Sequence, residues 1–211
     1  MVQVTAMTIR DLLDRLQEFD LLLSADPRFP SISGLVVGEA IPGSWWAHPK
    51  AHEMYRLSCE LLSHPDVLRL KLISGKVTLV HRPLWAAVFA IGTAREPWQM
   101  RSLSKEAKAL LKKVEKPMFA SGDAARELEK YLLVQSESVH TERGSHATQM
   151  QSWQSWADTV KLGKVKLTPA EARTLLEQVV ARLNKQFGAT GTLPWKSGAG
   201  HRPARTSRRV L

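Results

Sequence analysis

The chain contains a single cysteine, Cys59, among its 211 residues, and this scarcity excludes an internal disulfide framework. It has no CxxC pair, which argues against a structural zinc site, and no apolar run approaches the ~18 residues that a membrane span requires. Acidic residues near the N-terminus, Asp11, Asp14, Glu18 and Asp20, are atypical of a signal or transit peptide. We therefore expect a reduced, cytoplasmic protein without a membrane partner.

Several catalytic motifs are missing as well. The sequence has neither a nucleophile elbow nor a glycine-rich phosphate loop, so acyl transfer and nucleotide hydrolysis are disfavoured. His140, Glu142 and His146 lie close together in the chain, but they do not have a strong metal-ligand spacing. We predict neither a metal site nor another cofactor.

Acidic residues are scarce relative to basic ones, because 20 Asp and Glu stand against 30 Lys and Arg, for a formal net charge of +10. Five of these charges lie in the last sixteen residues, which contain no acid: Lys196, Arg202, Arg205, Arg208 and Arg209. Clustered cations release counterions when they bind phosphates, so the charge favours a nucleic-acid partner, and together with the motifs described below it favours DNA over RNA. A solubilising tail without a defined partner is the alternative.

Apolar periodicity predicts a mainly helical first half with one hairpin. Helical spacing covers residues 8–24, 49–63 and a buried segment from Pro83 to Gly92, while the connector 26–43 contains one short buried strand at 35–37. The segment 68–79 alternates around Ser74-Gly75 and predicts a hairpin with one apolar face, formed by Leu68, Leu70, Leu72, Val77 and Leu79. The acidic N-terminal helix also offers a surface for a protein partner.

The second half begins with two short helices, capped by Ser104 and Asp123, and continues with a strand pair over 132–149. Two helices followed by a strand pair is the order of a winged helix. Thr168 opens a final helix that runs to about residue 187. We predict an α+β fold, mainly helical, divided into an N-terminal helix and connector (1–43), a winged-helix-like globular domain (44–187) and a basic, disordered tail (188–211).

The densest group of chemically useful side chains lies between residues 132 and 156. In an extended strand Gln135 and Glu137 point to one face, while His140 and Glu142 point to the other. A carboxylate beside a developing oxocarbenium ion is a recurring solution to breaking a bond at an anomeric carbon, so Gln135 and Glu137 are the candidate catalytic pair. The alternative is that both are exposed residues of a wing.

Aromatic rings and cations are interleaved elsewhere in the chain, as base stacking combined with phosphate contact requires. The candidate nucleic-acid contacts of this kind are Trp45, Trp46, His48, Lys50 and Arg82. The alternative is that these tryptophans wedge their loops against the hairpin. A second set, Lys105, Lys108 and Lys112, forms a basic helix face suited to the phosphate backbone, although a solvated face explains it too.

The run from Gln135 to Val139, followed by His146, resembles the motif region of the AlkZ/YcaQ family of winged-helix DNA glycosylases. Glu137 and His146 keep that family's nine-residue spacing, and Arg143 lies one place before its arginine. The resemblance covers residues 104–156, and Glu137 replaces an Asp or Gln.

What the resemblance implies is removal of alkylated or crosslinked bases without a metal, with Gln135 helping to orient the attacking water. His140, Arg143 and His146 are then candidate DNA contacts, and Trp45, Trp46 or Trp153 could cover a flipped base. No lysine lies in the cluster, so a lyase step is not expected. The alternatives are a non-catalytic winged-helix regulator and an adaptor.

Overall fold

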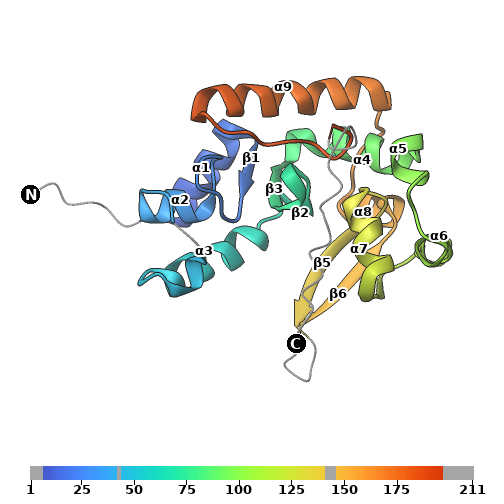
Figure 1. The fold of residues 1–211 in the computed structure, drawn as a ribbon, viewed down its shortest axis with the longest axis horizontal. Helices are drawn as coiled ribbons and strands as arrows, with labels where there is room; N and C mark the ends of the chain where they lie inside the picture. The colour runs from blue at the N-terminus through green and yellow to red at the C-terminus, as the bar shows by residue number, and fades with distance from the viewer. Residues whose placement is uncertain (1–6, 42–43, 141–145, 197–211) are drawn as a thin grey trace, which may run out of the picture.

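The computed structural model describes residues 7–41, 44–140 and 146–196. It has an α+β fold, 53% helical and 13% strand, with two small antiparallel sheets of three strands each (Figure 1). The expected α+β, mainly helical class is confirmed. Within the described ranges, no helix is long and apolar enough to cross a membrane.

The first sheet has the strand order β1-β3-β2 and contains a strand that the periodicity does not predict. Helix α1 (Ile9–Phe19) is capped by Thr8 and ends at Asp20, which adopts a left-handed conformation with φ 67°. Residues 21–23, expected to continue this helix, instead form β1 (Leu21–Leu23), and all three leucines are buried. A run of apolar residues fits a buried strand as well as a helix face, and the turn at Asp20 decides between them.

The predicted hairpin is present as β2 (Val67–Lys71) and β3 (Val77–His81), joined through the 3₁₀ turn η2 (Ile73–Gly75). Its register corrects the expected single apolar face, because Leu68 pairs with Val80, whereas Leu79 pairs with Arg69. Leu79 therefore lies on the face opposite to Leu68. The five-residue connection shifts the second strand by one position, and this reverses its faces.

Two further expectations in this half are wrong. Residues 35–37 belong to helix α2 (Ile32–Val37), because the Ser31 hydroxyl caps it by accepting the backbone N–H of Gly34. Gly92 does not stop helix α4 (Trp85–Ala94), which continues to Arg95 in a left-handed conformation. Two short 3₁₀ segments and one helix complete this half: η1 (Trp45–Ala47), α3 (Ala51–Leu62) and η3 (Arg82–Leu84).

The second sheet follows α5 (Pro97–Met100) and α6 (Lys105–Leu111), the latter capped by Ser104 as expected. Strand β4 (Met118–Phe119) precedes helix α7 (Gly122–Lys130), and the hairpin β5 (Gln135–His140) and β6 (His146–Gln151) completes the order β4-β6-β5. The predicted strand pair is confirmed. Ser121, not Asp123, occupies the cap position of α7, and Asp123 lies in its first turn.

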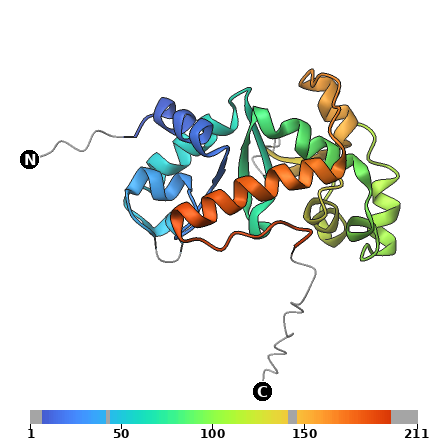
Figure 2. The ribbon, with the colours of Figure 1, turned by 90° about the horizontal axis from the view of Figure 1, so that it is seen from above.

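Two helices follow the second sheet, and the longer one spans the molecule. Helix α8 (Trp153–Thr159) is short, whereas α9 (Pro169–Phe187) begins with the expected Thr168 capping box. α9 extends over both halves of the fold (Figures 1 and 2). Near its end Arg182 donates to the Phe19 carbonyl, and near its start Arg173 pairs with Glu96.

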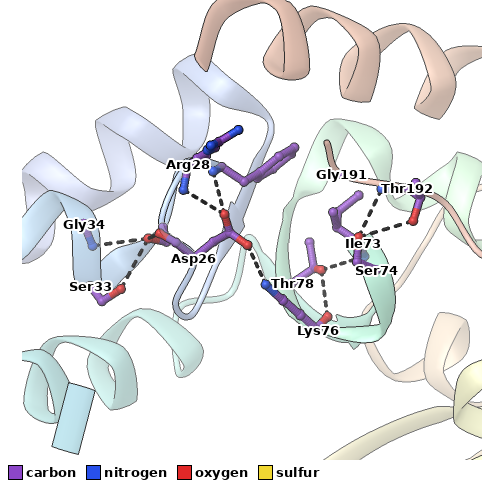
Figure 3. A network of polar contacts seen from close by, with 12 residues as sticks. Asp26, Arg28, Ser33, Gly34, Ile73, Ser74, Lys76, Thr78, Gly191 and Thr192 are labelled. Carbon is purple, nitrogen blue, oxygen red and sulfur yellow. Dashed lines mark hydrogen bonds and ion pairs between the residues drawn. The ribbon is translucent and has the colours of Figure 1, made fainter. Parts of the chain in front are cut away.

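The structure describes the chain after α9 as far as Lys196, and residues 188–196 of the predicted tail contact the folded body, for example through Gly191 and Trp195. This segment passes over the hairpin turn, where the Ser74 N–H donates to the Thr192 carbonyl at 2.7 Å. Next to this contact, Lys76 pairs with Asp26 at 2.6 Å, so polar contacts join three separate segments (Figure 3). Residues 197–211, the rest of the predicted tail, lie outside the described residues.

Apolar side chains form two clusters. The larger cluster contains buried residues from the first sheet, α1, α3, α4, α8 and α9, and the smaller one lies beneath the second sheet and includes Leu128 and Met150. Leu12 and Leu22, which precede residue 43, belong to the same cluster as Val80 and Leu176. The segment that we predict as a helix and connector therefore contributes to the main core.

Candidate functional site

A cleft of about 700 Å³ lies where β2 of the first sheet approaches β5 of the second. Side chains from α3, β2, β5, β6 and α8 line it, and both Gln135 and Glu137 are among them. Ser136, between the two, turns the other way and donates to the Glu129 carboxylate on α7 at 2.5 Å. The alternation of β5 thus directs the candidate catalytic pair into one cavity.

A chain of hydrogen bonds fixes the orientation of Gln135, which is only 5% exposed. The Ser155 hydroxyl donates to Gln151 Oε1 at 3.1 Å, and Gln151 Nε2 donates to Gln135 Oε1 at 2.9 Å. Gln135 and Gln151 are direct partners in the β5–β6 register. Because its carbonyl oxygen is engaged, and no described residue accepts from Nε2, Gln135 is oriented to offer a hydrogen-bond donor.

Glu137 is exposed and lies two residues further along the same strand face. It forms no ion pair with any residue that the structure describes. Arg69 of β2 lines the same cleft and is likewise unpaired within the described ranges. The Glu137 carboxylate, the oriented Gln135 amide and the Arg69 guanidinium therefore border one cavity, a combination that can hold water and an anionic ligand.

Two tryptophans give the cleft an apolar surface. The rings of Trp85 and Trp156 lie 5.2 Å apart, and Trp85 Nε1 donates to the Val80 carbonyl at 3.0 Å. The predicted contact Arg82 lies over Trp85, 5.2 Å from the ring centroid, and pairs with Asp66. Trp85 is 2% exposed and Trp156 is 5% exposed, so the two indoles form a packed, apolar base of the cleft.

Trp45 and Trp46 form an aromatic step beside the cleft. Their rings stack at 4.1 Å, and Trp46 approaches the Tyr55 ring at 5.5 Å. Trp46 is 61% exposed, and Tyr55 itself lines the cleft. The neighbouring Cys59 raises the pKa of the Tyr55 hydroxyl above its ordinary value of 10.0.

Several predicted contacts lie away from the cleft lining. His48 Nδ1 accepts the Lys50 backbone N–H within the same turn, and Lys50 Nζ donates to the Val36 carbonyl of α2. Trp153 is buried, and its Nε1 donates to the Leu132 carbonyl at 2.7 Å, which corrects its expected availability as a lid. Only backbone pairing of His140 with His146 is described.

The other predicted contacts lie at the surface or outside the residues that the structure describes. Arg143, Glu142 and the side chains of His140 and His146 lie outside the described residues. Lys105, Lys108 and Lys112 are exposed on and just after α6, where the last two border a separate groove. In the part of the chain that the structure describes, no cluster of three or more His, Cys, Asp or Glu could hold a metal ion.

Several lining residues were not expected from the sequence, among them Tyr55, His64, Arg69 and Gln151. The position of Gln151 beside Gln135 could have been predicted from the sequence, because a hairpin centred on residue 143 pairs position 135 with position 151. The other three come from α3, its following turn and β2, so their place depends on how the two sheets meet.

Comparisons with protein-family models, with curated proteins and with solved structures found no match for this chain.

Proposed function

We propose that the protein binds DNA and acts in repair as a monofunctional glycosylase, excising alkylated or crosslinked bases in the cleft of Gln135 and Glu137. The observation that carries the proposal is that both side chains line one cleft together with Trp85 and Trp156. A volume of about 700 Å³ falls within the range of small-molecule sites, and the base would enter it after leaving the helix stack.

The proposed reaction breaks the bond between the sugar C1′ and the base nitrogen, and forms a bond from C1′ to the oxygen of water. An alkylated base is cationic and leaves as a neutral molecule, so its departure needs no acid. The Glu137 carboxylate stabilises the oxocarbenium ion and accepts the proton of the attacking water. Gln135 Nε2 donates to that water or to the base edge, and no metal or other cofactor takes part.

The order of elements supports a winged-helix-like module as the framework. Helices α6 and α7 precede the β5–β6 hairpin, and β4 adds a third strand beside β6. In this proposal Arg143, which lies outside the described residues, is a DNA contact, as residues of a wing are. The positive charge of the chain supports the same partner.

A non-catalytic nucleic-acid-binding protein, a regulator or adaptor, is the second candidate. It is favoured by the exposure of Glu137, because burial is the usual means of tuning a catalytic carboxylate. In that case Gln135 would hydrogen-bond to the edge of a base, and the stacked pair Trp45 and Trp46 would pack against the face of a base.

Base release from alkylated duplex DNA tests the proposal. We expect release by the wild type, and a loss of about 10²–10⁴-fold in Glu137→Gln, the range of general acid–base catalysis. Gln135→Ala should also be impaired, whereas Asp123→Asn, a matched change at an exposed carboxylate of α7, should behave as wild type.

Other results would exclude the site or favour one of the alternative functions. Unchanged release by both cleft variants would exclude this site. No release by the wild type, with duplex binding that weakens steeply with salt, would favour the non-catalytic candidate, and binding without a salt slope would favour an adaptor.

A further inference from the structure

A second groove, of about 1050 Å³, lies along α8 beside the cleft. α6 and the segment after it form one wall, and the start and outer face of α8 form the other. Its lining includes four cations, Arg95, Lys108, Lys112 and Lys116, and two acids, Glu115 and Asp158. The groove therefore carries a net charge of +2.

The cations of this groove are not neutralised locally. None of the four forms an ion pair with a described residue, and all four are exposed. Asp158 already accepts a hydrogen bond from Gln154 at 2.9 Å. An anion bound here would meet free ammonium and guanidinium groups, with apolar surface from Leu111 and Val114 beneath them.

The groove and the cleft adjoin each other. Thr159, the last residue of α8, lines both of them. Ser155, which lines the groove, donates to Gln151, which lines the cleft and holds Gln135. A linear ligand that occupies the groove can therefore continue past Thr159 into the cleft.

We propose that this groove holds the phosphodiester backbone of the nucleic-acid strand whose unstacked nucleotide enters the Gln135–Glu137 cleft. The proposal rests on the proposed function for the choice of nucleic acid, and it adds the path of the strand. Phosphates lie outside the bases along a strand, so cations in the groove and an aromatic, amide-lined cleft match the two parts of a nucleotide. A concave groove suits a strand better than a flat lipid surface.

The structure gives different positions to Lys105, Lys108 and Lys112, which lie on and just after α6. Lys108 and Lys112 border the groove, whereas Lys105 does not. Arg95 and Lys116, from the end of α4 and the loop before β4, complete the positive lining. Binding to the exposed face of α6 alone would involve Lys105 as well. Substituting Lys105 therefore distinguishes binding along the groove from binding to α6 alone.

Salt-dependent binding of a fluorescently labelled single-stranded DNA oligonucleotide to the full-length protein tests the path. We expect Lys108→Glu/Lys112→Glu to lower affinity at least tenfold and to reduce the slope of log K against log salt by about 0.7 per lost contact. Arg10→Glu/Lys185→Glu, an equal charge change at two exposed sites away from the groove, should bind within about twofold of wild type. Lys105→Glu alone should also stay near wild type.

The outcomes separate the two proposals. If the wild type binds but the groove and control variants lose affinity equally, the path is wrong while nucleic-acid binding stands. If the wild type shows no salt-dependent binding to the oligonucleotide or to duplex DNA, both fail; if it binds duplex DNA alone, only the path of the strand is wrong. Binding of the groove to a polyglutamate peptide or to phosphatidylglycerol vesicles in preference to the oligonucleotide would also overturn the phosphodiester assignment.

Discussion

The two sheets of this protein have the same number of strands but different contents. In the first sheet, β1 is fully buried and the central strand β3 buries Thr78, Leu79 and Val80, so apolar contacts cover both faces. In the second sheet, β5 begins with the buried polar residues Gln135 and Ser136. The comparison indicates that the first sheet supplies stability and that the second uses burial to orient polar groups.

Replacing a buried leucine of the central strand should have the largest effect on stability. Leu79 is fully buried, and Leu79→Ala removes its contacts on the face opposite to Leu68. We expect a loss of about 2–5 kcal/mol in the free energy of unfolding, measured by denaturant titration. Thr148→Ala, at a half-buried position in β6, should cost far less. Equal losses would contradict the assignment of stability to the first sheet.

The junction between the two halves should be the next most sensitive place. A Cβ atom at Gly92 would lie 2.2 Å from Trp153 Nε1, and that indole is held by the Leu132 carbonyl. Gly92→Ala should therefore destabilise the protein by about 1–3 kcal/mol through overpacking. Gly163→Ala is the control, because a Cβ there meets nothing within 4 Å. A neutral Gly92→Ala would show that α4 and α8 can separate without cost.

Removing the support of Gln135 should affect function more than stability. Gln151→Ala deletes the donor to Gln135 Oε1, and we expect a loss of about 1 kcal/mol in unfolding free energy. DNA binding or base release should fall much more, because Gln135 loses its fixed orientation. Gln178→Ala on the exposed face of α9 serves as the control for both measurements. A purely structural role would reduce stability and leave activity per folded molecule unchanged.

The smallest effect concerns the ion pair that joins α5 to α9. Burial tends to raise the pKa of Glu96, but Arg173 and the Trp98 indole outweigh it and hold the pKa below its ordinary value of 4.5. The pair therefore stabilises the fold above about pH 4.5, and this contribution is lost as the pH falls through the lower, folded-state pKa.

Unfolding measured against pH checks this contribution. Glu96→Gln should cost about 0.5–1 kcal/mol at pH 7, and the difference from wild type should vanish at acidic pH. A difference that persists at low pH would assign the effect of the substitution to packing.

Local chemistry explains which elements could be predicted. Thr168 with Glu171, and Ser104 with Ala107, cap their helices through contacts within four residues, so α9 and α6 begin where the sequence indicates. Residues 21–23 could not be placed in the same way. Their assignment to a strand depends on pairing with residues 78–80, far along the chain.

Only the part of the candidate site that lies on the β5–β6 hairpin could be predicted from the sequence. Alternation places Gln135 and Glu137 on one face, and the structure directs both into the cleft. The opposite wall, with Tyr55 and Arg69, comes from the first half of the chain, and its approach to β5 results from the packing of the two sheets. The groove combines Arg95, at the end of α4, with Lys108 and Lys112, so it depends on how α4 and α6 lie relative to each other.

The central claim is that a nucleotide occupies the cleft beside Gln135. Side-chain amide resonances of ¹⁵N-labelled protein, recorded while an abasic-site or alkylated oligonucleotide is added, test this most directly. We predict that the Gln135 and Gln151 side-chain signals shift strongly, while that of Gln178 on α9 stays in place. Unchanged Gln135 and Gln151 signals at saturating oligonucleotide would contradict the claim.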